Sequence, residues 1–152
     1  MSTPSPLFDT PPLVDPVSGF QAWFFDDRRT AVTQATGPVM SKAAADFLTG
    51  PFDDELKKRF VSKGLKVRLV HDWRSLETYD PETRSRLIAW GNGNEPHTEY
   101  GGIALSNRAS IFARIAVTTA IGALRIFGAN IESLDDRIDQ VISELKATRS
   151  AS

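Results

Sequence analysis

The chain has 152 residues, the usual size of one domain and enough to bury a hydrophobic core without cross-links. Its 18 Lys and Arg against 19 Asp and Glu give a net charge of −1, so the overall charge does not attract nucleic acid or anionic lipid. The sequence contains no cysteine, which excludes a disulfide framework and thiolate chemistry and fits a reducing compartment. We therefore expect a cytoplasmic protein.

The N-terminal segment is unusually rich in proline. Five of the nine prolines fall within the first 16 residues, so residues 1–17 are predicted to form a flexible arm. This segment has neither the basic start nor the apolar centre of a secretory signal. Residues 18–146 are expected to form the folded domain, followed by a C-terminal tail, 147–152.

The next elements are a predicted hairpin and two short helices. An aromatic-rich strand over 20–25, a polar turn and a β-branched run to Thr36 are typical of a β-hairpin. The first strand is apolar on both sides, so helices or another chain should cover it. Ser41 is placed to cap a helix over 42–48 that ends at Thr49-Gly50-Pro51, and a second helix is expected over 53–64.

From residue 65 onward, strands and helices alternate. The hydrophobic pattern predicts strands over 65–73, 101–107 and 129–134, and helices over 81–91, 109–127 and 135–147. This order indicates an α/β fold: a mixed sheet of four to five strands with an N-terminal β-hairpin, parallel βαβ units and right-handed crossovers.

The segment 109–127 is the most apolar part of the chain. Arg114 and Arg125 interrupt it, leaving an uncharged stretch much shorter than the ~20 residues that a membrane span requires. We therefore expect no membrane insertion, and a largely buried helix with a narrow polar edge.

The stretch "VRLVHDWRSLETYDPETRSRLIAW" joins a predicted strand, closed by Asp72, to a predicted helix that begins after Asp80. Asp80 is suited to cap the first amides of this helix, and Pro81 suits the first helical position because it has no amide to satisfy. Glu82 would face the positive end of the helix dipole. Capping accounts for each of these residues without a further function.

The strand-closing Asp72, the loop "DWRSLETYD" and the helix opened by Asp80 resemble the STAS superfamily, the sulfate-transporter and anti-sigma-factor-antagonist domains, also called SpoIIAA-like. In that family an Asp-Ser-Ser-Gly motif opens the helix and carries the phosphoacceptor serine. Here Pro81 and Glu82 stand where the serine pair belongs and Thr83 stands where the glycine belongs. The usual phosphorylation switch is therefore absent from its expected place, and Glu82 puts a fixed negative charge there. An alignment shifted by one residue would instead make Thr83 the phosphoacceptor, which is the weaker of the two interpretations.

The resemblance implies a non-catalytic interaction module in bacterial signalling or assembly, which binds a protein partner or a second copy of itself. The family docks partners through this region together with the neighbouring helix, here 109–127. The expected partner-binding residues are Asp72, Arg74, Glu77, Asp80, Glu82, Thr83 and Arg84. Arg84 could pair with Glu77 or with an acidic partner. A second hypothesis is a domain that shelters a small apolar, lipid-like ligand beneath the apolar helix 109–127.

Other functional readings find less support in the sequence. Asp72 and Glu77 could form an acid–base pair, but no nucleophile accompanies them, so no enzyme activity is expected. His71 and His97 lack the spacing and the further ligands of a zinc site, and no metal or cofactor is expected. "GNGNEPH" follows a helix, so Gly91 is interpreted as the residue that ends this helix and not as part of a phosphate loop. The basic run 57–68 is interpreted as a solvated helix face, and no nucleic-acid binding is expected.

Overall fold

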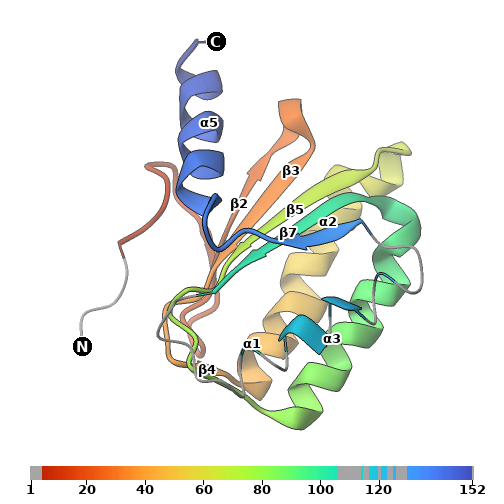
Figure 1. Ribbon diagram of the computed structural model, residues 1–152. Coiled ribbons are helices and arrows are strands. Elements are labelled where there is room, and N and C mark those ends of the chain that lie inside the picture. The colour runs from red at the N-terminus through yellow and green to blue at the C-terminus, as the bar shows by residue number, and fades with distance from the viewer. Residues whose placement is uncertain are drawn as a thin grey trace.

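The computed structural model describes residues 5–105 and 130–151, together with residues 114, 117–119, 121, 122 and 125. Within them one mixed sheet contains six strands in the order β1-β2-β3-β5-β7-β8 (Figure 1). Its strands are β1 Leu13–Val14, β2 Gln21–Phe25, β3 Thr30–Gln34, β5 Val67–Asp72, β7 Thr98–Ala104 and β8 Ile131–Ser133.

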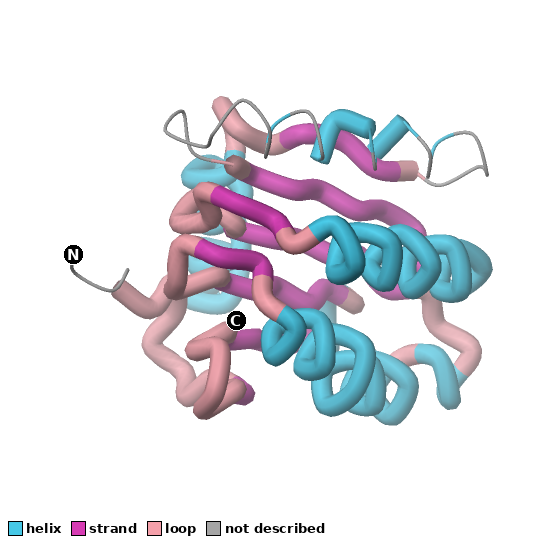
Figure 2. The backbone as a smooth tube through the Cα atoms, turned by 90° about the horizontal axis from the view of Figure 1, so that it is seen from below, coloured by secondary structure: helices cyan, strands magenta, loops and turns pink. Residues whose placement is uncertain are grey.

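The strand directions confirm the predicted hairpin and the parallel βαβ units. β2 pairs with β3 in antiparallel fashion around the 3₁₀ turn Asp26–Arg28, and β3, β5, β7 and β8 are mutually parallel neighbours. The strands lie side by side as one layer (Figure 2). The sheet has six strands instead of the expected four to five, because the N-terminal segment supplies β1. A separate parallel pair, β4 Val39–Met40 and β6 Thr78–Tyr79, lies outside this sheet.

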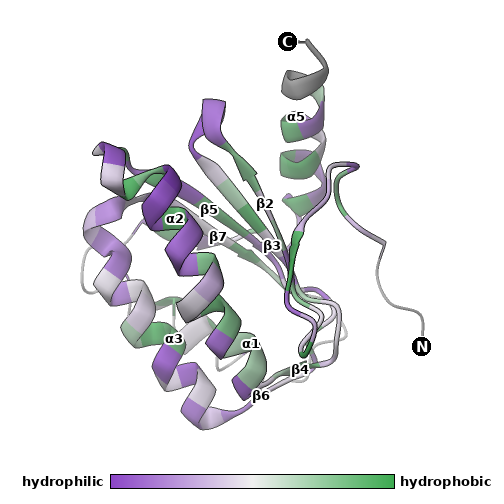
Figure 3. Cartoon of the chain, turned by 180° about the vertical axis from the view of Figure 1, so that it is seen from behind, coloured by the Kyte–Doolittle hydropathy of each residue, from purple (hydrophilic) through white to green (hydrophobic). Residues whose placement is uncertain are grey.

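Helices cover both faces of the sheet. α1 Lys42–Phe47, α2 Asp53–Arg59 and α3 Pro81–Asn94 lie on one face, and α5 Ile138–Ala151 lies on the other (Figure 1). Right-handed crossovers between parallel strands that follow one another across a sheet place the connecting helices on the same face, which accounts for this arrangement. α2 and α3 carry both hydrophilic and hydrophobic stretches (Figure 3), as helices packed by one side against a sheet require.

Each face has its own apolar cluster. The cluster on the face of α1–α3 includes Phe20, Phe52, Leu69, Trp73 and Ile103. The cluster on the face of α5 includes Trp23, Val70, Leu134, Ile138 and Leu145. Consecutive residues of β5, Leu69 and Val70, fall in opposite clusters, as the alternation of side chains along a strand dictates.

The predicted helices differ from the observed ones at their ends. Ser41 caps α1 as expected, its hydroxyl accepting the Ala44 amide at 3.2 Å. The expected break at 49–51 is wrong: a π-helical turn, Leu48–Phe52, carries the chain from α1 directly into α2, with Pro51 inside it. The C-terminal segment 147–152, expected as a tail, belongs to α5 through Ala151.

The end of α3 also differs from its prediction. Gly91 does not end the helix, which continues to Asn94 and is followed by the 3₁₀ turn Glu95–His97. The buried carboxylate of Asp53 on α2 accepts hydrogen bonds from Trp90 Nε1 at 2.9 Å and from Asn94 Nδ2 at 3.3 Å. These tertiary contacts hold the last turn of α3 in place despite its glycines.

Residues 5–14 pack against the sheet, where the sequence predicts a flexible arm. β1 pairs with the first two residues of β2, and the Trp23 indole donates to the Thr10 carbonyl at 2.9 Å. The buried Phe8 ring makes edge contacts with Trp23 and Phe25. This segment therefore covers part of the apolar hairpin strand for which the sequence requires a cover.

Most of the expected helix 109–127 lies outside the described residues. Its described residues 114, 117–119, 121, 122 and 125 are helical. Val117 and Ile121 are buried in the apolar cluster on the face of α1–α3. Arg114 pairs with Asp135 at 3.1 Å.

Candidate functional site

The expected site residues Asp72 and Arg74 form an internal ion pair at the carboxyl end of β5. Asp72 is buried, and its two carboxylate oxygens each accept a hydrogen bond of 2.9 Å from the Arg74 guanidinium. Arg74 also contacts Asp139 on α5 at 2.9 Å. The hydrogen bonds from Asp72 raise the pKa of Arg74 above its usual value, so the guanidinium stays charged. Arg74 therefore lies between Asp72 at the end of β5 and Asp139 on α5, and both carboxylate oxygens of Asp72 accept a hydrogen bond within the fold.

The loop between Asp72 and Asp80 is held by the segment that precedes α1. The amides of Glu77 and Thr78 both donate to the Pro38 carbonyl, at 2.7 Å and 3.1 Å. The Ser75 hydroxyl donates to the Gly37 carbonyl at 2.8 Å, and Leu76 is fully buried. The pairing of β4 with β6 continues these contacts. The loop is therefore an anchored part of the fold.

Asp80 and Thr83 form the predicted cap at the start of α3. The Asp80 carboxylate accepts the Thr83 amide at 2.9 Å and the Thr83 hydroxyl at 3.1 Å. Thr83 is buried, whereas Glu82 is exposed on the same turn. Pro81 is the first helical residue, as predicted.

We expect Asp80→Ala to lower the free energy of unfolding by about 1 kcal/mol, because two hydrogen bonds at the start of α3 lose their acceptor. Urea denaturation followed by circular dichroism measures this change. Glu82→Ala is the matched control and should alter stability by less than about 0.5 kcal/mol, since Glu82 is exposed. Equal stability of Asp80→Ala and the wild type would contradict the capping role.

The seven expected site residues do not gather at one surface. Asp72 forms an ion pair with Arg74, and Asp80 accepts a hydrogen bond from Thr83. Glu77 and Glu82 are exposed. No ion pair between Arg84 and Glu77 occurs in the described part of the chain. Arg84 instead lines a cavity beneath α3, with residues that the sequence analysis does not assign to a site.

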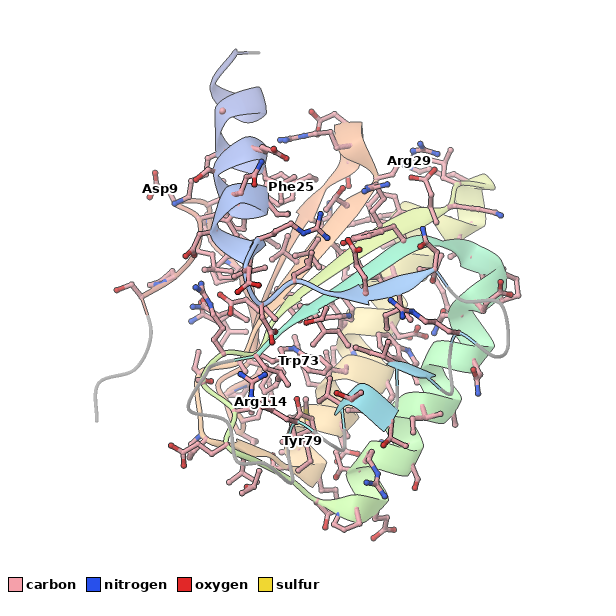
Figure 4. All side chains as sticks on the ribbon, viewed as in Figure 1. Asp9, Phe25, Arg29, Trp73, Tyr79 and Arg114 are labelled. Atoms are coloured by element: carbon pink, nitrogen blue, oxygen red, sulfur yellow. The ribbon has the colours of Figure 1, made fainter. Side chains whose placement is uncertain are left out.

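The α3 cavity, as we call it, is a partly open pocket lined by residues of β5, β7, β8 and α3 and by the described Val117, and its volume is about 100 Å³. Leu69 and Ile103 contribute from the sheet, and Leu87, Ile88 and Trp90 contribute from α3. Trp73 and Tyr79, which also line it, lie near one another at the carboxyl end of the parallel strands (Figure 4). Carboxyl ends of parallel strands are where α/β proteins commonly bind ligands.

Two glycines help to explain why there is a hollow here. Gly101 lies on β7 between Leu69 of β5 and Ile131 of β8, and all three residues line the cavity. A Cβ atom at Gly101 would meet its nearest neighbour, Ile131 Cγ1, at 3.5 Å, so a side chain would be tolerated there. Gly91 lines the cavity from α3, in a helix interior where glycine costs about 1 kcal/mol relative to alanine. Glycine in both walls leaves volume that ordinary side chains would fill.

His71, Thr33 and Trp73 form a buried hydrogen-bonded group beside the cavity. The Thr33 hydroxyl lies 2.6 Å from His71 Nδ1 and accepts the Trp73 indole N–H at 3.1 Å. Burial lowers the pKa of His71 to about 4, so the ring is neutral at pH 7. Because the Thr33 hydroxyl proton is free to point to Nδ1, we assign the imidazole proton to Nε2.

Tyr79 brings an unsatisfied polar group to the same cavity. Its hydroxyl is fully buried and has no hydrogen-bond partner among the residues that the structure describes. Burial raises the pKa of Tyr79, so the hydroxyl remains protonated at neutral pH. A buried hydroxyl without a partner costs about 1–3 kcal/mol, which a bound acceptor would relieve.

The other candidates of the sequence analysis lie apart from this cavity or are internally paired. His97 precedes β7, whereas His71 pairs with Ile103 near the far end of that strand, so about 20 Å of strand separates the two histidines. Within the described ranges, no three His, Cys, Asp or Glu side chains are grouped as metal ligands would be. In the basic run, Lys57, Lys58 and Arg59 pair with acidic neighbours on α2, and Arg68 pairs with Glu99.

Sequence reasoning missed His71, Tyr79, Trp90 and the two glycines as cavity residues. The alternation of side chains along β5 places Leu69 and His71 on the same face of the sheet. This alternation was the one feature of the sequence that could have identified His71 as a cavity residue. Which residues of β7 and α3 oppose them depends on long-range pairing.

No helix in the described part of the chain is both long and apolar enough to span a membrane. Comparison with protein-family models, with curated proteins and with solved structures gives no significant match in any of the three.

Proposed function

We propose that this protein is a STAS-like module that binds a small, mainly apolar ligand in the α3 cavity. The observation that carries the proposal is an apolar cavity of about 100 Å³ between the sheet and α3, whose lining also includes the polar residues Tyr79 and Arg84. Ligand sites in proteins commonly combine apolar walls with a few polar groups that orient the ligand.

The arrangement of elements supports the STAS-like part of the proposal. A hairpin leads into successive parallel strands, and the connecting helices α1, α2 and α3 lie on one face of the sheet. The loop from Asp72 to Asp80 and the capped start of α3 occur in the expected order. This protein lacks the serine of the family motif, so a phosphorylation switch is not part of the proposal.

The contacts that the expected docking residues already make within the fold favour a small ligand over a protein partner. Asp72, Arg74, Asp80 and Thr83 use their side chains for contacts within the fold. A docking surface built on them would first have to break those contacts. The cavity requires no such change, because its walls are formed by side chains already in place.

Titration with pentan-1-ol, followed by NMR, tests the proposal. The indole N–H signals of Trp73 and Trp90 should shift because both rings line the cavity, whereas the signal of Trp23, which belongs to the α5 side of the sheet, should not. Scaling from an apolar cavity of about 150 Å³ that holds benzene, the α3 cavity encloses about four carbon atoms. Pentan-1-ol therefore suits it if four of its carbons enter the apolar part and its CH₂OH group lies toward the polar lining residues.

We expect Gly101→Val to abolish these shifts, because the new side chain occupies the volume that the probe would fill. Thermal unfolding should show no loss of stability, since the nearest atom to the new Cβ lies at an ordinary contact distance of 3.5 Å. Ser133→Val, on the exposed part of β8, is the matched control and should retain the shifts. Unchanged signals of Trp73 and Trp90 in the wild type would contradict the proposal and favour protein docking instead.

A further inference from the structure

The α3 cavity has an unpaired positive charge at one end. Arg84 is half-buried and lines the cavity, and it makes no ion pair or side-chain hydrogen bond with any residue that the structure describes. Its spacing from Asp80 would allow an ion pair across one helical turn. The Asp80 carboxylate instead accepts hydrogen bonds from the amide and hydroxyl of Thr83. Its role as helix cap therefore takes the place of an ion pair with Arg84.

The other charged residue in the described lining, Glu95, is too distant to neutralise Arg84. Eleven residues of helical rise separate the two, which corresponds to about 16 Å along the axis. The cavity therefore has a cationic end, with Arg84, and an opposite end with Glu95 and Asn130. A ligand with a single negative charge would be oriented by this difference.

Tyr79 supplies a second donor to the same cavity. Its buried hydroxyl has no acceptor among the described residues and stays protonated, so it can donate a hydrogen bond to a ligand. Arg84 also only donates. A complementary ligand group therefore carries negative charge and accepts hydrogen bonds, as a carboxylate does.

We propose that the ligand of the α3 cavity is a short-chain monocarboxylate, whose carboxylate binds Arg84 and the Tyr79 hydroxyl while its aliphatic chain occupies the apolar part. This inference rests on the proposed ligand-binding function. A carboxylate suits the site better than a phosphate monoester, because Arg84 is the one cation in the described lining and would leave a dianion incompletely paired. The cavity volume limits the enclosed chain to about four carbon atoms.

The test compares pentanoate with pentanamide, a neutral molecule of almost the same shape, by NMR titration of the full-length protein. We expect the wild type to bind pentanoate at least about tenfold more tightly than pentanamide, as a charge-assisted hydrogen bond provides. Arg84→Met should remove this preference by weakening pentanoate binding about tenfold, with pentanamide binding unchanged within about twofold.

Two further variants make the result specific. Arg86→Met is the matched control, since Arg86 lies on the same helix but pairs with Asp46 and Thr49 and does not line the cavity, so the preference should persist. Tyr79→Phe should weaken pentanoate binding severalfold and raise the melting temperature of the free protein, because it removes a buried hydroxyl that lacks a partner. A purely structural role of Tyr79 would leave pentanoate binding unchanged.

The outcomes separate this inference from the proposed function. Equal affinity for pentanoate and pentanamide, with no effect of Arg84→Met, would overturn the carboxylate assignment and leave the ligand-binding function standing. Binding of neither compound, together with unchanged tryptophan signals in pentan-1-ol, would overturn both.

Discussion

Arg74→Met is expected to lower the free energy of unfolding by about 2–3 kcal/mol, because it leaves the buried carboxylate of Asp72 without its counter-charge. Removing one partner of a buried ion pair typically costs 3–5 kcal/mol. The Arg74 side chain is 36% exposed, so water can reach one side of the pair and reduce this cost. Urea denaturation at pH 7 measures the change.

Asp139→Asn is the control for Arg74→Met. Asp139 also contacts Arg74, but its side chain is 81% exposed, so its loss should change stability by less than about 0.5 kcal/mol. If Arg74→Met were as stable as the wild type, Asp72 and Arg74 would be free to serve as a docking surface for a partner. A large loss of stability, together with a small effect of Asp139→Asn, instead identifies the Asp72–Arg74 pair as a structural feature of the end of β5.

The second large effect is a loss of stability in mild acid caused by His71. The pKa of its imidazole is about 4 in the folded protein, against an ordinary value of 6.5. Between these values the unfolded chain binds a proton that the folded protein does not, so stability falls as the pH decreases. For this group alone, the expected loss from pH 7 to pH 5 is about 2 kcal/mol.

Replacing His71 with glutamine should flatten this dependence on pH. The glutamine amide can still accept the Thr33 hydroxyl proton but does not titrate. Urea denaturation at pH 7, 6 and 5 measures the slope, and His97→Gln serves as the control that should retain it. An identical slope in His71→Gln and in the wild type would show that the pKa of His71 is not lowered in the folded protein.

Local patterns in the sequence account for most of the secondary structure. The β-branched and aromatic runs predict β2, β3 and β5, and side-chain caps at Ser41 and Asp80 predict the starts of α1 and α3. These predictions hold because strand alternation and helix capping depend on residues within a few positions of each other. The order of the elements was sufficient to predict parallel pairing of β5 with β7, since short crossovers favour adjacent parallel strands.

Long-range packing decided the features that local patterns placed wrongly. α3 continues through Gly91 because Asp53, 38 positions earlier in the sequence, binds Trp90 and Asn94. Residues 5–14 are ordered against the sheet because Phe8 and Thr10 meet Trp23 there. For α3, tertiary contacts outweigh a cost of about 1 kcal/mol for a glycine in a helix interior. For residues 5–14, they outweigh the lost conformational freedom of the chain, about 1–2 kcal/mol per ordered residue.

The candidate site also has a part that local sequence patterns predict and a part that depends on long-range packing. Asp80, Thr83 and their cap are neighbours along the chain, so the sequence was enough to predict their geometry. The α3 cavity instead depends on strand register, which brings Gly101 beside Leu69 and Ile131, and on the packing of α3 over them. A cavity forms where the surrounding side chains are too small to fill the space between them. Those side chains come from residues far apart in the sequence, so the cavity could not be predicted before the fold was known.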